Sequence, residues 1–190
     1  MKALYISVAI LLSFTLLLSS FEITLFLFHS PINSEIIEPK AHSMTWIYLL
    51  KQKYMAFIDL DIFTLYEKRH LLDVKRLFDK IYYIWVIVSI LTISFILFIY
   101  FIDKKRFFLI LRYNLFIVFL TILLSILILI NFLDSFSFLH QLIFLGHSWV
   151  FPDNSILIEW FPLSYFQEFM VIIIFIYIIS SWLLTNINQT

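Results

Sequence analysis

Four long apolar runs constrain this chain more than any other feature of its sequence. They cover about residues 3–28, 81–102, 107–132 and 169–184. A helix needs roughly 20 apolar residues to cross the hydrocarbon core of a bilayer, and these runs match or approach that length. Only 14% of the 190 residues are charged, too few to give a soluble domain its polar surface. We predict an all-α membrane protein with four transmembrane helices, forming a single membrane domain over residues 1–190.

The first run could be a signal peptide by position. It is longer than a typical signal-peptide apolar region and lacks a small-residue cleavage pattern, so we interpret it as a retained membrane anchor. Two polar segments, residues 29–80 and 134–167, separate the runs. Because two crossings lie between these segments, they share one side of the membrane. They are the first and third loops between the spans, and we predict that these loops 1 and 3 form one cap.

The short connection between the second and third runs favours a cytoplasmic position, because it carries Lys104, Lys105 and Arg106. The first polar segment is also rich in Lys and Arg, but acids are interleaved with them, as in a folded, solvated cap. We therefore predict a multi-pass cell-membrane protein with both termini cytoplasmic and the cap extracellular.

Composition excludes several classes of function. Lys+Arg and Asp+Glu balance at 13 each, so no nucleic-acid partner is expected. Zero Cys excludes disulfides, thiol nucleophiles and Cys-ligated metals, and a single Gly excludes a glycine-rich phosphate loop. The sequence does not determine the oligomeric state.

Both polar segments contain signals of local structure. Helical spacing of apolar residues predicts helices over 44–58 and 66–79, the second running directly into the second span. Residues 151–154 read as a turn, and Phe161-Pro162 reads as a further break. The aromatic residues of 134–167 are dense enough to suggest partial burial at the membrane interface.

His70 is the first candidate for chemistry. On a helix, Glu67, His70 and Asp73 lie three residues apart along one face, and a carboxylate beside an imidazole fixes its tautomer and raises its basicity. An ordinary solvated helix face with local ion pairs would show the same spacing, so this alternative stays open.

His140 is the second candidate, because it lies among apolar residues just beyond the third run. A titratable group at membrane depth is costly and is a site candidate for that reason. A histidine satisfied by a backbone carbonyl is the alternative. The same argument applies to Glu22, which lies near the outer end of the first run and could simply reach the headgroups.

Three other histidines are less informative. His29 and His42 read as interfacial or surface residues, and His147 as a turn residue or a neighbour of the site. His70, His140 and His147 together could supply zinc ligands, but we expect neither a metal nor another cofactor. A pair of histidines on one face of the membrane, ringed by aromatics, could instead act as general base and general acid.

A longer pattern links the two segments: Glu67-x-x-His70-x-x-Asp73, then His140-x-x-x-Phe144, then Trp149-x-Phe151-Pro152. This pattern resembles the lipoprotein intramolecular transacylase family, membrane enzymes found mainly in Gram-positive bacteria, and the resemblance covers the whole four-span layout. The chain departs from the family at Leu139, where an aromatic is expected, and at Gly146-His147-Ser148, where Asn/Asp-like turn residues are usual.

The resemblance implies an acyltransferase that acts on a diacylated lipoprotein among membrane lipids. It would move the sn-2 acyl chain to the α-amine of the lipoprotein's N-terminal Cys, giving a lyso-form product. The family's catalytic histidines fall on His70 and His140, and Glu67, Asp73, Phe144, Trp149 and Phe151 would support them or position substrate. The alternatives are another interfacial acyltransferase or hydrolase, and a non-catalytic membrane scaffold or accessory protein.

Overall fold

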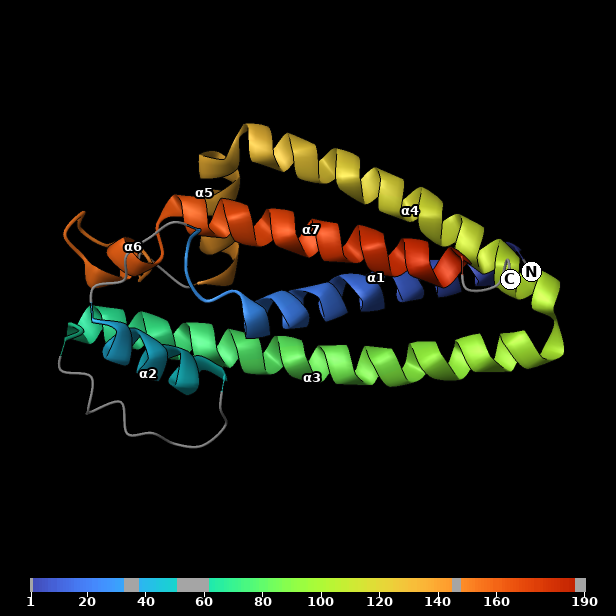
Figure 1. The fold of residues 1–190 in the computed structure, drawn as a ribbon, viewed down its shortest axis with the longest axis horizontal. Helices are drawn as coiled ribbons and strands as arrows, with labels where there is room; N and C mark the ends of the chain where they lie inside the picture. The colour runs from blue at the N-terminus through green and yellow to red at the C-terminus, as the bar shows by residue number, and fades with distance from the viewer. Residues whose placement is uncertain (1, 33–37, 51–61, 145–147, 187–190) are drawn as a thin grey trace. The chain divides into compact units, whose positions relative to one another are not determined.

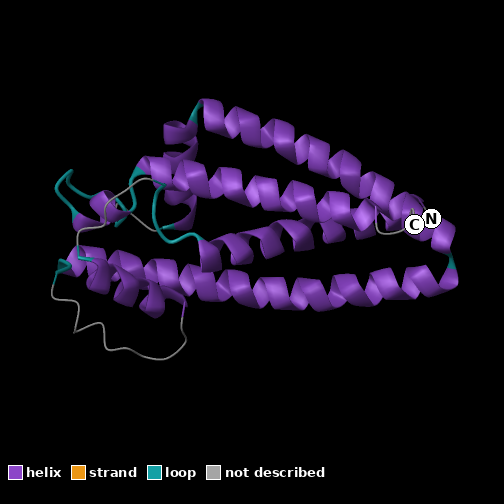
Figure 2. Cartoon of the chain, viewed as in Figure 1, coloured by secondary structure: helices purple, strands orange, loops and turns teal. Residues whose placement is uncertain are grey.

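The computed structural model describes residues 2–32, 38–50, 62–144 and 148–186. Within these residues every regular element is a helix, as Figure 2 shows. An all-helical fold is therefore what the apolar runs predicted. The chain divides into two compact units, residues 1–25, 81–130 and 170–190 in the first and residues 26–80 and 131–169 in the second. The prediction that residues 1–190 form a single domain stays a prediction.

Four helices are long and apolar enough to cross a membrane, which confirms the predicted number of spans (Figure 1). They are α1 (Lys2–Leu27), α3 (Leu65–Ile102), α4 (Lys104–Ile130) and α7 (Leu163–Asn186). The 38 residues of α3 would extend about 57 Å, roughly twice the hydrocarbon thickness. Its charged first part, residues 65–80, thus lies outside the apolar span. The helix predicted over 66–79 is confirmed, as is its direct continuation into the second span.

In the first unit, α1 packs one buried face against α3 and α4. Ala9 of α1 and Ile110 of α4 are fully buried in this core, and Leu184 of α7 packs against it. Polar side chains add contacts between helices: Ser13 bonds to Tyr177 of α7, and Thr15 bonds to Thr92 of α3 at 2.6 Å. Hydroxyls paired in this way can be buried in an apolar bundle without an unsatisfied group.

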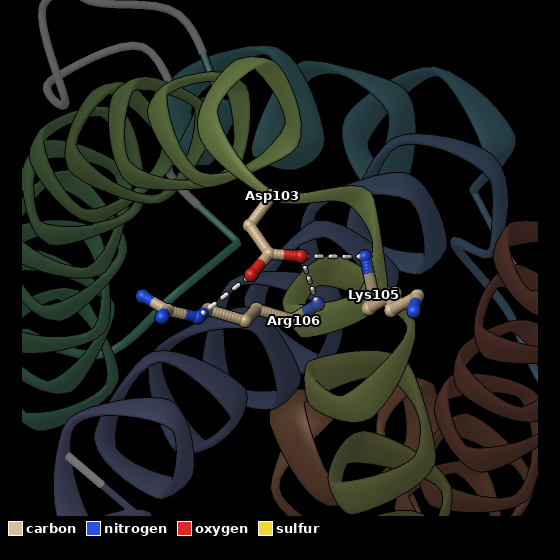
Figure 3. Close-up of polar contacts among 3 residues, drawn as sticks. All are labelled: Asp103, Lys105 and Arg106. Atoms are coloured by element: carbon tan, nitrogen blue, oxygen red, sulfur yellow. Dashed lines mark hydrogen bonds and ion pairs between the residues drawn. The ribbon is translucent and has the colours of Figure 1, made fainter.

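The connection between α3 and α4 is closed by Asp103, shown in Figure 3. Its Oδ1 accepts hydrogen bonds from the backbone N–H of Lys105 at 3.0 Å and of Arg106 at 3.3 Å. Its Oδ2 lies 2.9 Å from Nε of Arg106. Asp103 therefore satisfies free amides at the start of α4 and complements its helix dipole, which makes the short return predicted from the sequence possible.

The second unit contains α2 (Pro39–Leu50), the first part of α3, α5 (Phe132–Ile143), α6 (Ile156–Trp160) and the start of α7. Helix α2 begins five residues before the predicted helix over 44–58, since proline is tolerated in a first helical turn. Residues 51–58 of that prediction lie outside the described residues. The turn over 151–154 and the break at Phe161-Pro162 are both confirmed.

The segment 134–167 was interpreted as a loop, and here the interpretation was wrong in part. The third span ends at Ile130, and a separate amphipathic helix, α5, follows it. Asn131 separates α4 from α5, because its backbone angles, φ −123° and ψ 60°, are not helical. Its Nδ2 donates a hydrogen bond to Asp134 at 2.8 Å. The predicted third span, which ran to residue 132, therefore included the start of a separate helix that hydropathy alone does not distinguish. Helix α7 likewise begins six residues before the predicted span, directly after Pro162.

Candidate functional site

The position of His70 is set by a capping box at the start of α3. Thr64 donates from its backbone N–H and its hydroxyl to Oε2 of Glu67, at 2.7 and 2.8 Å. The backbone N–H of Glu67 donates in return to the Thr64 hydroxyl at 3.3 Å. This reciprocal arrangement starts the helix at a defined residue, and His70 follows Glu67 by three positions.

Glu67 also ties α3 to the residue that precedes α6. Its Oε1 accepts a hydrogen bond from the Ser155 hydroxyl at 2.5 Å, and the residue is only 3% exposed. Burial alone would raise the pKa of this carboxyl, but the hydrogen bonds from Ser155 and Thr64 outweigh burial and lower it. In the described structure Glu67 is therefore an ionised anchor, and no hydrogen bond joins it to His70.

Asp73 lies one turn beyond His70. Its carboxylate forms an ion pair with Arg76 at 3.5 Å, and the Arg76 side chain is exposed whereas that of Asp73 is partly exposed. It acts on His70 only through its charge, which favours the protonated imidazole. Asp73 thus belongs to the solvated face of the helix, while influencing the site electrostatically.

The His70 imidazole lies among aromatic rings. The centroid of Phe144 is 4.8 Å from it and that of Phe151 is 5.3 Å from it, both approached edge-on. Its Nδ1 is buried and has no hydrogen-bond partner in the described structure. Burial, followed by repulsion from His140, lowers the pKa of His70 to about 4 against the opposing charge of Asp73. His70 is therefore neutral at physiological pH.

His140 lies in the last turn of α5, and the helix fixes its tautomer. Its Nδ1 is 2.9 Å from the carbonyl oxygen of Phe136, one turn earlier. A carbonyl can only accept, so Nδ1 carries the proton and Nε2 keeps its lone pair. Burial lowers the pKa of His140, although the bond to Phe136 partly opposes this. His140 thus presents a neutral imidazole with Nε2 as its basic atom.

The two imidazoles face one another within a single aromatic cluster, which we call the His70–His140 site. Their centroids are 6.5 Å apart and their planes differ by 28°. Trp149 lies 5.3 Å from His140, and Phe144 contacts both imidazoles. Neither imidazole hydrogen-bonds to the other in the described structure. A reacting group that enters the site can therefore meet two neutral imidazoles, His140 through Nε2 and His70, whose Nδ1 has no partner in the described structure.

Most of the residues proposed for the site from sequence thus come together. Phe144, Trp149 and Phe151 contact one or both imidazoles, whereas Glu67 and Asp73 are engaged elsewhere. The neighbours that sequence reasoning missed are Thr64, Phe136, Ser155 and Phe166. The pattern Thr64-x-x-Glu67 is itself the signal of a capping box. The pairing with Ser155 leaves no comparable signal.

The remaining candidates lie apart from this site. His29 stacks on Trp46, and His42 packs between Trp160 and Phe161. His147 lies outside the described residues. Among the residues that are described, no group of three or more His, Asp or Glu side chains could hold a metal ion. Glu22 lies in α1, and one of its carboxylate oxygens, Oε1, is buried without a partner in the described structure.

The four apolar helices define an integral membrane protein whose second unit carries a buried pair of imidazoles. The family model of the lipoprotein intramolecular transacylase Lit matches residues 3–166. The chain belongs to this family, and it is therefore an acyltransferase of the transacylase type, as the sequence predicted.

Solved structures share the fold. The lipoprotein intramolecular transacylase Lit from Bacillus cereus aligns with a TM-score of 0.72 at 19% identity, over 100% of this chain and 96% of that one. A variant of the Bacillus cereus protein with one histidine replaced by arginine aligns with a TM-score of 0.67 at 18% identity, over 96% and 89% of the two chains. No curated protein sequence matches the chain.

Proposed function

We propose that the protein transfers the sn-2 acyl chain of a diacylglyceryl lipoprotein to the α-amine of the lipoprotein's own N-terminal Cys. The product is an N-acylated lipoprotein whose glyceryl group has a free hydroxyl at sn-2. The observation that carries this proposal is the pair of neutral imidazoles, His70 and His140, 6.5 Å apart in one aromatic cluster of a chain from this family.

The reaction makes three polar demands on the enzyme. The α-ammonium group has a pKa near 8, so it first gives one proton to solvent, and the neutral amine must then lose a second proton to become the nitrogen of an amide. The ester carbonyl oxygen gains negative charge as the C–N bond forms. The glyceryl oxygen then leaves as the C–O bond breaks, and it needs a proton. No covalent acyl-enzyme is required, because donor and acceptor belong to one substrate molecule.

His140 is the better base of the pair, because Phe136 holds its proton on Nδ1 and leaves Nε2 free to take the amine proton. The same imidazolium then returns this proton to the leaving glyceryl oxygen. His70 stays neutral throughout, as its pKa of about 4 favours, and hydrogen-bonds to the leaving oxygen. One proton moves from nitrogen to oxygen, and no water is consumed.

The other site residues act through position. Glu67 fixes the start of α3 and the residue before α6, Asp73 adjusts the charge near His70, and the rings of Phe144, Trp149 and Phe151 form an apolar mould. When the site holds the amine against the ester of the same molecule, most of the entropy cost of bringing the two groups together is met before the reaction begins. Positioning of this kind supplies up to roughly 7–11 kcal/mol in the best cases.

The proposed topology places both termini in the cytoplasm and the second unit at the outer surface of the cell membrane, beside lipid-anchored substrates. The cations Lys104, Lys105 and Arg106 in the connection of α3 to α4 support this orientation. Membrane lipids would then surround the four spans, and the substrate would approach from within the outer leaflet.

The test is to express the protein in bacteria whose lipoproteins carry only the diacylglyceryl group, and to analyse lipoprotein N-terminal peptides by mass spectrometry. Wild type should convert them to N-acylated, lyso-glyceryl peptides of unchanged total mass, distinguished by fragmentation. His70→Ala and His140→Ala, produced at equal levels, should leave them unconverted. Unchanged lipoproteins in cells with the wild-type protein would refute the proposal.

A further inference from the structure

Trp149 carries the one polar side-chain atom among the described aromatic neighbours of the two catalytic candidates. His70 contacts Phe144 and Phe151, and His140 contacts Trp149 and the three phenylalanines 136, 144 and 166. A phenylalanine ring neither donates nor accepts a conventional hydrogen bond. Every conventional side-chain hydrogen bond from these neighbours to a reacting group would therefore come from the Trp149 indole.

The indole N–H of Trp149 is buried and has no hydrogen-bond partner in the described structure. A buried donor without a partner destabilises the folded protein, so such groups are rare unless they serve a purpose. Two other tryptophans offer a contrast: Nε1 of Trp46 donates to the carbonyl oxygen of His29 at 2.8 Å, and Nε1 of Trp85 donates to Ser19 at 2.9 Å. The indole ring that carries this unsatisfied donor has its centroid 5.3 Å from that of His140.

We infer that the Trp149 indole N–H donates a hydrogen bond to the ester carbonyl oxygen of the substrate and stabilises the negative charge this oxygen gains in the tetrahedral intermediate. This inference rests on the proposed function. An indole nitrogen can only donate, so it cannot take the amine proton, and it suits an oxygen that becomes more negative. His140 Nε2 and the neutral His70 meet the other two polar demands.

The balance of the step is simple. The amine nitrogen forms a bond to the carbonyl carbon, the carbonyl π electrons move onto oxygen, and His140 takes the amine proton. The C–O bond to glycerol then breaks, the carbonyl re-forms and the leaving oxygen gains the proton. Trp149 neither loses nor gains a proton. Its hydrogen bond strengthens while the oxygen is charged, so it would lower the barrier rather than tighten substrate binding.

The test compares Trp149→Phe with wild type, using purified protein and a synthetic diacylglyceryl lipopeptide with a free N-terminal Cys amine. Removing one oxyanion donor lowers kcat by roughly 10²–10³-fold in enzymes that use one, and we expect a loss in this range with KM nearly unchanged. Trp182→Phe is the matched control, because Trp182 is 59% exposed on α7 and has no part in the site. It should retain the wild-type rate.

A second variant separates the N–H from the ring. Incorporation of benzothienylalanine at position 149 replaces the N–H by sulfur and preserves the shape of the side chain, so it should lose kcat as Trp149→Phe does. Wild-type kcat in this variant would overturn the inference. So would a rise in KM without a fall in kcat, or an equal loss in Trp182→Phe. If wild type itself forms no N-acylated product, the proposed function fails instead, which is a separate result.

Discussion

Two pairs of histidines lie in the second unit, and comparing them shows what distinguishes a reactive arrangement from a structural one. His42 is 5% exposed, and burial followed by repulsion from His29 lowers its pKa, as burial and His140 do for His70. Both pairs are surrounded by aromatic rings. Each pair therefore contains a buried histidine with a lowered pKa, so neither property identifies a site.

The difference lies in what the polar atoms meet. His42 hydrogen-bonds to the backbone of His29, and Trp46 donates to the same carbonyl oxygen. Neighbouring backbone is held similarly, since the Tyr165 hydroxyl donates to the carbonyl of Phe28 at 3.0 Å. These bonds fasten the segment that follows α1. In the His70–His140 site, the hydrogen bond to backbone that the structure describes stays within α5, from Nδ1 of His140 to Phe136. Nε2 of His42 and Nδ1 of His70 both lack a partner among the described residues, so a free nitrogen alone does not separate the pairs. The first pair fastens a chain segment, whereas the second brings two imidazole centroids within 6.5 Å of each other.

The strongest test of the difference between the two pairs is to replace His70 and His140, one at a time. Replacing His140 by Ala removes the proposed base, and general acid–base groups contribute typically 10²–10⁴-fold, so we expect a loss of that size in kcat/KM. His70→Ala should also lose activity, by a smaller factor because it donates a hydrogen bond without accepting the proton. Initial rates with the diacylglyceryl lipopeptide measure both. Retention of more than a tenth of the wild-type rate by His140→Ala would contradict the assignment of the base.

Acid should destabilise the protein, because His70 is buried in its neutral form. Between pH 6.5 and about 4 the unfolded chain binds a proton at this position and the folded protein does not, so the free energy of unfolding falls as the pH falls. At about 1.4 kcal/mol per pH unit, the full effect is about 3 kcal/mol. Thermal unfolding in detergent between about pH 7.5 and 4.5 should show this decline. It should be shallower in His70→Phe, and identical slopes would refute the contribution of His70.

Ser155→Ala tests the anchor that holds the first part of α3, which carries His70, to the second polar segment, residues 134–167. It removes the hydrogen bond to one buried oxygen of Glu67, so we expect a loss of about 1–3 kcal/mol in the free energy of unfolding. The lost bond also leaves the Glu67 carboxyl easier to protonate, so the loss should diminish as the pH falls. Ser94→Ala, a change at a hydroxyl that bonds only within its own exposed turn of α3, is the matched control. Equal effects of the two changes would contradict the anchoring role.

His42→Phe should have the smallest effect. Phenylalanine keeps the ring packing against Trp160 and Phe161 and removes the buried Nε2, which has no partner among the described residues. It also loses one hydrogen bond to the His29 backbone, a cost of about 0.5–1.5 kcal/mol that the lost burial of a polar nitrogen offsets. Transfer rates should stay within about threefold of wild type. A hundredfold loss of the transfer rate would show that the His29–His42 pair also takes part in catalysis, and the distinction between the two pairs would fail.

Particular residues show how far the sequence could predict this molecule. The four spans follow from hydropathy, and the contact between the two polar segments follows from counting crossings. The break at Asn131 does not, because Phe132 and Leu133 continue the apolar run directly past it and no Gly or Pro marks the end of a helix there. Once α5 is known to be a helix, the bond from His140 to Phe136 needs no further information, since it joins residues one turn apart. The pairing of Glu67 with Ser155 depends on how the chain reverses after Pro152, which no periodicity records.

The Glu67–Ser155 bond has a consequence for biosynthesis. Ser155 follows Glu67 by 88 positions, which at roughly 5–20 residues per second corresponds to roughly 4–18 s of translation. During this interval a nascent chain can form the Thr64–Glu67 capping box. The partners His140 of His70 and Ser155 of Glu67 have not yet been synthesised or have not yet reached their places. We expect the growing polypeptide to remain inert beside passing lipoproteins until its third crossing is inserted and the following segment has emerged, so activity would begin only as synthesis nears its end.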